Sequence, residues 1–279
     1  MNVRRIRVIN GAALARAYAG FSAGEHRLLL LFRHVDLADG PLVLTTVSAL
    51  LPRIARDAGI RLPKRPHTHF LYGRDVLNWA GAAARWAFPR TGGIPVQNGR
   101  VDREAQAWMR QIAAHGEYPL ALAPEAQVTY RMDRCSELAG GTAHVARWVL
   151  QETQGKLPVL LLPIGIRYTD PLGPDEAVRE SLEEIGVALG LRVPRSGQLR
   201  DDVLACLDSV LGAIEDAYRA FGSLPPASEG LSPGERITLL MDAILAQVEA
   251  VLGLSGAGST LQRLFAFRYR IMDLQYPPH

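Results

Sequence analysis

The sequence predicts an α/β fold, with a largely parallel mixed sheet that carries helices on both faces, followed by a helical C-terminal extension. Over about the first 170 residues, short apolar runs of strand length alternate with longer stretches of helical periodicity. This order is typical of parallel strands joined by helices. From about residue 175 the strand patterns cease and only helix patterns remain. We therefore expect a basic amphipathic helix over residues 1–24, an α/β domain over 25–172 and the helical extension over 173–279.

The α/β pattern has five strand runs and four helices between them. The first strand is an unbroken apolar run, Leu28–Phe32, which is too short for a helix. The other expected strands cover His67–Tyr72, Gly93–Val96, Pro119–Ala123 and Pro158–Tyr168. The expected helices cover Leu42–Ala58 with Gly59 as a stop, Val76–Trp86 after Asp75, Arg103–His115 capped by Asp102, and a segment from Gly141 to about Gln154.

The helical extension shows four amphipathic segments separated by turn-forming linkers such as Ser223–Pro226. The segments cover Asp175–Gly190, Leu199–Phe221, Pro233–Leu252 and Thr260–Met272. Their apolar faces have three candidate partners, namely the sheet, another chain or lipid, and the sequence does not choose among them.

Composition and sequence patterns argue against a disordered, a cysteine-rich metal-binding, a membrane-spanning and a secreted protein. The chain has 279 residues, of which 48% are hydrophobic and 21% charged, as is ordinary for a folded globular protein. The two cysteines, Cys135 and Cys206, have no metal-ligand spacing around them and fit a reducing compartment. The chain shows neither a bilayer-spanning apolar run nor the apolar core of a secretory signal, so we expect a cytoplasmic protein.

The first 33 residues are strongly basic, with six arginines against the single acid Glu25. A basic amphipathic helix can lie on an anionic membrane surface, which predicts peripheral attachment to the inner face of the membrane. The alternative is a solvated helix packed on the domain. No nucleic-acid partner is predicted, and no pattern indicates an oligomeric state.

The first strand ends in a polar cluster that contains His34, Asp36 and Asp39. Neutral imidazole can accept a proton from a hydroxyl near neutral pH. A carboxylate on the other ring nitrogen would set the tautomer and stabilise the imidazolium that forms. The carboxyl end of such a strand is where α/β sheets place their chemistry. The alternative is a histidine at a strand end in an ordinary polar loop.

Two further patterns suggest chemistry but have weaker support. His67 and His69 would share one face of a strand, yet no further ligand pattern accompanies them, and we predict no metal site. Gly20–Gly24 matches the G-x-S-x-G pattern around Ser22, which suggests a hydrolase. A nucleophile elbow needs a strand before it and a helix after it, and here that order is reversed.

Four landmarks in chain order resemble the glycerolipid acyltransferase superfamily, which includes the glycerol-3-phosphate and lysophosphatidic acid acyltransferases. They are His34-x4-Asp39, Gly92–Val96, Ala123-Pro124-Glu125 and Leu161–Gly165. The family carries a His-x4-Asp block, a G-x-I-P-V-x-R block, an F-P-E-G-T-R block and a late V-P-V block. The likeness covers about residues 25 to 170.

The resemblance implies that His34 is a general base and that Asp39 orients it. Glu125, with Pro124 beside it, would help to form the acceptor side of the site, and Gly92, Gly93 and Ile94 match the second block. The implied co-substrate is acyl-CoA or acyl-carrier protein, the implied acceptor is a lipid, and no metal or other cofactor is implied.

The chain departs from the family at both arginines that contact the phosphate of the acceptor. These positions hold Asn98 and Val128, and Gly-Thr-Arg of the third block is replaced by Ala126-Gln127-Val128. Among nearby arginines, Arg90 and Arg131 are our candidates for substrate binding, with Arg100 and Arg134 close in sequence; an arginine fork suits phosphate oxygens. The alternative for Arg90 and Arg131 is an ordinary surface charge.

The sequence thus leads to an O-acyltransferase that moves a fatty acyl group from a thioester to a hydroxyl of a (lyso)phospholipid or related acceptor. The degenerate third block motivates an alternative, a catalytically silent lipid-binding or scaffold protein with the same fold.

Overall fold

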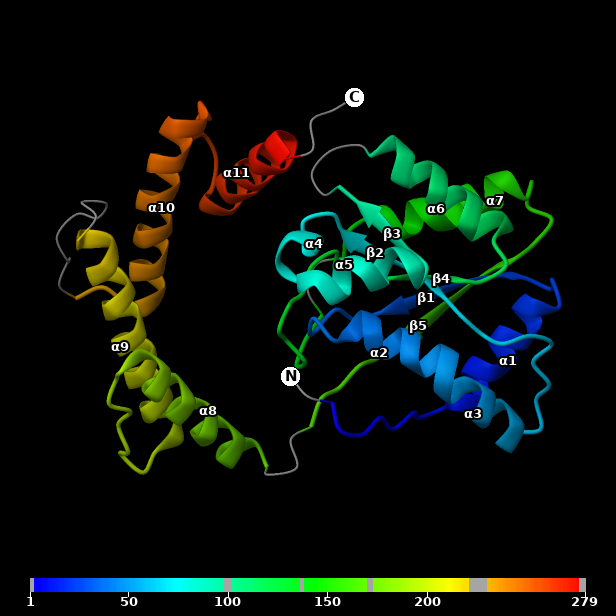
Figure 1. Cartoon of the computed structure of the whole chain (residues 1–279), viewed down its shortest axis with the longest axis horizontal. Coiled ribbons are helices and arrows are strands. Elements are labelled where there is room, and N and C mark those ends of the chain that lie inside the picture. Colours follow the sequence, from blue (N-terminus) through cyan, green and yellow to red (C-terminus); the bar gives the residue numbers. More distant parts are fainter. Residues whose placement is uncertain (1–2, 98–101, 136–137, 170–172, 221–229, 276–279) are drawn as a thin grey trace. The chain divides into compact units, whose positions relative to one another are not determined.

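The computed structural model describes residues 3–97, 102–135, 138–169, 173–220 and 230–275, and all statements below concern these residues. The chain divides into two compact units, Met1–Tyr168 and Thr169–His279. The boundary lies within a few residues of the expected one. Figure 1 shows the helices and strands of both units.

Unit 1 is built on a five-stranded, all-parallel sheet with strand order β3-β2-β4-β1-β5. This confirms the predicted α/β class, with no antiparallel strand among the described residues. The strands are β1 Arg27–Phe32, β2 His69–Gly73, β3 Gly93–Val96, β4 Leu120–Leu122 and β5 Val159–Ile164. Because all strands run the same way, their carboxyl ends share one edge of the sheet.

Helices cover both faces of this sheet (Figure 1). On one face, buried or partly buried side chains of a first group of helices pack against Leu28, Leu30 and Phe32 of β1. The opposite face packs its Leu29 and Leu120 against the other two helices. The first group is α1 Gly11–Ser22, α2 Asp39–Thr45 continuing through the π-turn η1 Thr46–Leu50 into α3 Leu51–Asp57, α4 Val76–Trp79 and α5 Gly81–Arg90; the second is α6 Arg103–His115 and α7 Gly141–Glu152.

The predicted N-terminal helix over residues 1–24 is wrong in extent and in surroundings. The helix begins only at Gly11, so Arg4, Arg5 and Arg7 precede it. Tyr18 in its middle is fully buried, and its hydroxyl donates to the backbone oxygen of His67 at 2.5 Å. Because the apolar face of α1 is buried in the core of unit 1, this helix is part of the α/β domain and not a separate amphipathic segment.

Two other predicted elements differ in detail. The helix expected over Val76–Trp86 is split, because Gly81 adopts a left-handed φ of 84° that interrupts the helical backbone. The last strand ends at Ile164 and lies at the edge of the sheet, which accounts for Pro163, since an edge residue can lack a backbone donor. Leu161 on this strand is 44% exposed.

The described residues of unit 2 form four helices, each packed against the next in sequence. They are α8 Pro174–Leu189, α9 Leu199–Ala220, α10 Pro233–Leu252 and α11 Thr260–Gln275, close to the predicted bounds. The linker Ser223–Pro226 and residue Phe221 lie outside the described residues. Ser232 and Glu235 form the capping box that begins α10.

Charged pairs tie these helices together. The guanidinium of Arg263 on α11 donates at 2.8 Å to both Asp242 and Glu249 of α10. Arg236 of α10 likewise binds Glu215 of α9 at 2.8 and 2.9 Å. Since Glu249 is buried, its partner Arg263 is needed to compensate its charge.

Candidate active site

His34 and Asp39 meet at the carboxyl edge of the sheet. β1 ends at Phe32, and His34 follows two residues later, just before α2 begins at Asp39. The Nδ1 atom of His34 lies 3.3 Å from Oδ2 of Asp39. The imidazole is 24% exposed whereas the carboxylate is fully buried. An ionised carboxylate only accepts, so it holds the proton on Nδ1 and leaves Nε2 with a free lone pair.

Asp39 accepts hydrogen bonds from two groups besides His34. The backbone amide of Asp36 donates to Oδ2 at 2.7 Å, and the hydroxyl of Tyr168 donates to Oδ1 at 2.5 Å. Burial alone would raise the pKa of Asp39, but the hydrogen bonds from His34, Tyr168 and Asp36 outweigh burial and lower it. The Asp39 carboxylate is therefore a fixed negative charge behind the imidazole.

Tyr168 is a site residue that the sequence reasoning missed. It follows β5, far from Asp39 in sequence, and burial together with its bond to the Asp39 carboxylate raises the pKa of its phenol. The available signal was its place at the end of a predicted parallel strand, the same edge as His34.

The lowered pKa of Asp39 predicts a pH dependence of stability. A carboxyl group with a lower pKa in the folded state stabilises the fold above its unfolded pKa, and this contribution is lost as the pH falls through the folded pKa. We expect unit 1 of the wild type to lose more stability between pH 6 and pH 3 than Asp39→Asn does. All four tryptophans lie in unit 1, so urea unfolding followed by tryptophan fluorescence measures this difference. Equal losses in the two proteins would contradict the prediction.

Asp36, the extra carboxylate of the first block, shapes the turn that joins His34 to α2. Its Oδ1 accepts from the amide of Ala38 at 2.8 Å, and its backbone oxygen accepts from the amide of Asp39 at 3.1 Å. Asp36 therefore holds the turn, while Asp39 contacts the imidazole.

Glu125 supports the site from the turn after β4, and its side chain is almost completely buried. Its Oε2 accepts from the backbone amide of His34 at 2.9 Å, and its Oε1 accepts from Arg33 at 3.2 Å. Arg33, which the sequence reasoning also missed, donates further to the backbone oxygens of Arg131 and Arg134. Through these bonds Glu125 fixes the backbone that carries His34. This is a positioning role, whereas the resemblance implied that Glu125 helps to form the acceptor side of the site.

The loop after Glu125 is anchored on the histidine segment. The amide of Thr129 donates to the oxygen of His34 at 2.8 Å, and that of Tyr130 donates to Val35 at 3.0 Å. The loop later returns to its own start, where the amide of Ala139 donates to the backbone oxygen of Pro124 at 2.8 Å. These bonds place Pro124 and the exposed Arg131 at the same edge as His34.

Ala126 lies in this loop with a φ of 57°, a left-handed conformation that costs a residue with a Cβ about 1–2 kcal/mol. We expect Ala126→Gly to raise the stability of unit 1 by about 0.5–1 kcal/mol, since part of the gain is offset by glycine's backbone entropy. Urea unfolding followed by tryptophan fluorescence measures the change. The matched control is Ala123→Gly. Ala123 does not have a left-handed φ, so glycine relieves no strain there and should lower the stability of unit 1. A loss of stability in both variants would contradict the prediction.

The second-block residues lie away from His34. Gly93 pairs with Phe70, which pairs with Ala121, which in turn pairs with Leu30. Gly93 is therefore level with a residue four positions before His34, about 13 Å along the strand. This separation follows from the parallel sheet, in which the start of β3 lies toward the amino edge.

The structure gives these second-block residues packing roles. A Cβ on Gly92 would lie 2.9 Å from ring nitrogens of both His67 and His69, and a Cβ on Gly93 would lie 2.6 Å from the oxygen of Phe88. Ile94 is buried against α6 and α7. The structure thus does not bring Gly92, Gly93 and Ile94 to the histidine as the resemblance implied.

Arg90 is also remote from the candidate site. It is the last residue of α5, before Gly92 and the amino end of β3, and its guanidinium stacks 5.2 Å from the ring of Trp86. The structure therefore separates Arg90 from His34. Asn98 and Arg100 lie outside the described residues, so Arg131 is the described candidate arginine that reaches this edge.

The other suggested chemistry finds no support in the described residues. Ser22 is the last residue of α1 and no strand precedes it, so the nucleophile elbow is absent there. The rings of His67 and His69 are 6.0 Å apart and both lie against Tyr118. No group of three or more metal-ligating side chains occurs in the described part of the chain.

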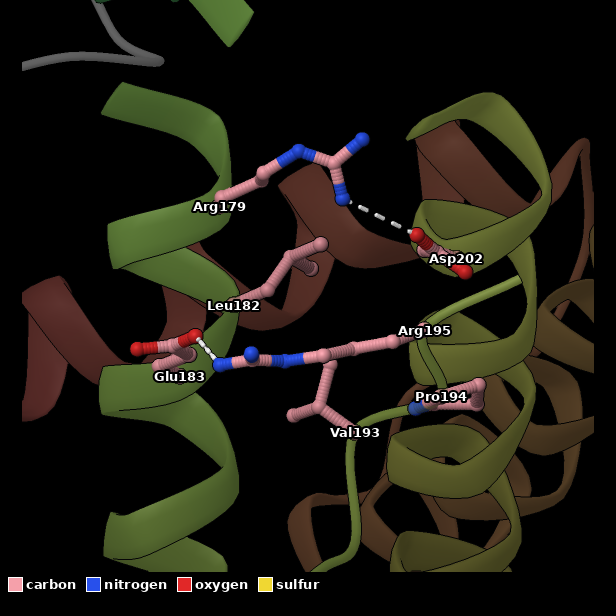
Figure 2. A pocket seen from close by; sticks show the side chains of 7 residues that line it. All are labelled: Arg179, Leu182, Glu183, Val193, Pro194, Arg195 and Asp202. Carbon is pink, nitrogen blue, oxygen red and sulfur yellow. Dashed lines mark hydrogen bonds and ion pairs between the residues drawn. The ribbon is translucent and has the colours of Figure 1, made fainter. Parts of the chain in front are cut away.

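Two hollows have linings that do not include His34. One, of about 610 Å³, lies between α3 and the segment Ile60–Pro66 of unit 1. The other, of about 310 Å³, lies between α8 and α9 of unit 2, where Arg179 pairs with Asp202 and Arg195 with Glu183 (Figure 2). The charged residues that line this second hollow pair with one another, which favours a structural role for them.

No helix in the described ranges combines the length and the apolar character that crossing a bilayer requires. Comparison of the sequence with models of protein families gave no match, and comparison with curated proteins gave none either.

Proposed function

We propose that this chain is an O-acyltransferase that moves an acyl group from a thioester to a hydroxyl. The observation that carries the proposal is the His34–Asp39 pair, with the Nδ1 side of the ring held by a buried carboxylate and the ring partly exposed. Such a pair suits a general base that must take a proton and then give it up.

In the proposed reaction, Nε2 of His34 takes the proton of the acceptor hydroxyl as its oxygen attacks the thioester carbonyl carbon. The new C–O bond forms, the C–S bond breaks, and the imidazolium returns its proton to the leaving thiolate. Asp39 stabilises the imidazolium because its carboxylate lies against Nδ1. Acyl-CoA or acyl-carrier protein would supply the acyl group.

The proposed acceptor is a (lyso)phospholipid or a related lipid alcohol. Arg131 is exposed at the edge that carries His34 and is free to meet an anionic headgroup. The resemblance to the glycerolipid acyltransferases supports this choice, although Val128 replaces one of the family's phosphate-binding arginines.

The test is thiol release by the purified full chain given acyl-CoA and a panel of lysophospholipids. We expect release that depends on a hydroxyl acceptor, with the acylated lipid detected by mass spectrometry. A reaction without acceptor measures hydrolysis of the thioester and serves as the control. No turnover with any donor, acyl-carrier protein included, or with any acceptor would contradict the proposal.

A second candidate is a catalytically silent lipid-binding protein with the same fold, which the altered third block, Ala126-Gln127-Val128, favours. It predicts vesicle binding that His34→Ala leaves unchanged, together with no thiol release.

A further inference from the structure

Exposed apolar side chains surround the candidate site on the loops of the carboxyl edge. Leu37, in the turn after His34, is 51% exposed, and Tyr130 and Leu138, in the loop after β4, are 69% and 62% exposed. The amides of Thr129 and Tyr130 bind the backbone oxygens of His34 and Val35, so this loop lies directly beside the histidine. Burying an exposed Leu or Tyr would release free energy, yet unit 1 leaves all three exposed.

Arginines alternate with these apolar residues. Arg131 and Arg134 lie in the same loop, and Arg167 follows β5 at the same edge; all three are exposed. Arg134 lies 3.9 Å from Asp133 in this loop, whose sequence also contains Glu137, whereas Arg131 and Arg167 have no ion pair among the described residues. We name Leu37, Tyr130, Leu138, Arg131, Arg134 and Arg167 the collar. Its three charged members are all arginines.

We propose that the collar docks on an anionic membrane surface and holds His34 at the boundary between lipid and water. This inference rests on the proposed function, since it names the surface that would supply the lipid acceptor to that site. Aromatic and aliphatic side chains interleaved with arginines match the headgroup layer, where apolar groups enter the acyl boundary and cations meet lipid phosphates.

The make-up of the collar favours a lipid surface over a protein partner. The core of a protein interface is depleted of charge and presents a continuous packed patch. Here Tyr130 is followed at once by Arg131, and Leu37, Tyr130 and Leu138 are separated from one another in sequence by charged and polar residues. Such spacing suits a fluid surface that fits itself around each side chain, and binding should weaken with salt because of the arginines.

The test is sedimentation of the full chain with unilamellar vesicles, either of phosphatidylcholine alone or with phosphatidylglycerol added. We expect binding to the mixed vesicles, weaker binding at high salt and weaker binding to phosphatidylcholine alone. The double variant Leu37→Ser/Tyr130→Ser should bind about tenfold or more weakly, because each side chain loses its burial in the membrane.

The matched control is Val187→Ser/Val251→Ser, which removes two side chains of unit 2 that are 86% and 84% exposed. It should bind vesicles like the wild type, and far-ultraviolet circular dichroism, which reports on the helices of both units, should show that both double variants are folded. Absence of vesicle binding by the wild type, or equal loss in the two double variants, would overturn the inference.

Thiol release with a short-chain lysophospholipid, dissolved as monomers, separates this inference from the proposed function. Release from the dissolved acceptor without vesicle binding would refute the collar and leave the acyltransferase standing. Vesicle binding that depends on Leu37 and Tyr130 without any thiol release would refute the acyltransferase and leave the collar standing.

Discussion

His34→Ala is expected to lower acceptor-dependent thiol release by about a thousandfold or more, within the range in which general bases contribute to catalysis. Alanine removes the only group at this position that can take the hydroxyl proton. The fold should survive, since the backbone amide of His34 still donates to Glu125 and its oxygen still accepts from Thr129.

His115→Ala is the matched control for this variant. His115 ends α6, its side chain is 47% exposed, and it lies 4.0 Å from Glu152. We expect its thiol release to match that of the wild type. If His34→Ala were folded and retained wild-type turnover, the general-base role would be refuted.

Asp39→Asn is expected to lower turnover by about 10²- to 10⁴-fold, because a neutral amide neither fixes the Nδ1 proton nor stabilises the imidazolium. The side chain keeps its size, so unit 1 should remain folded, at a cost of about 1–2 kcal/mol for the weaker hydrogen bonds in a buried place. Turnover against pH, together with kcat and KM measured separately, checks the role. A loss in kcat with little change in KM is the expected signature of a residue that acts through His34.

Two neighbours serve as controls for Asp39. Tyr168→Phe removes one donor to the Asp39 carboxylate but leaves the pair with His34 intact, so turnover should fall much less. Asp36→Asn preserves an oxygen that can accept from Ala38 and should also have a small effect. Equal losses in all three variants would indicate a structural disturbance of the turn and contradict the assigned role.

Most of the secondary structure could be predicted because each signal is local. Asp102 caps α6 through the amide of Ala105, and the predicted range Arg103–His115 agrees with the structure. The range Pro233–Leu252 of α10 follows from Ser232 before it and Gly253 after it. The errors came where tertiary packing decides, as in α1, whose basic flank suggested a membrane helix although its apolar face is buried in the core.

The site was only partly predictable for the same reason. The spacing of His34 and Asp39 spans one turn at the end of a strand, so a local pattern brings them together. Tyr168 and Arg33 reach the site through pairs far apart in sequence, which no local spacing reveals. Conversely, Gly92 matched the second block and Arg90 flanked it, but both precede β3 and therefore lie toward the amino edge of the sheet. Strand direction decides this, because only the carboxyl end of β3 lies at the edge that carries His34.

The sequence by itself determined the α/β class, the helical extension and the histidine with its carboxylate, since these follow from periodicity, capping and short spacings. Only the tertiary structure decided the parallel strand order, the burial of Asp39 with its hydrogen bond from Tyr168, and the role of Glu125 as the group that holds the backbone of His34. The physical reason is that burial and hydrogen bonds between distant residues arise only when strands far apart in sequence pair side by side. The pattern of a single segment therefore does not reveal these contacts.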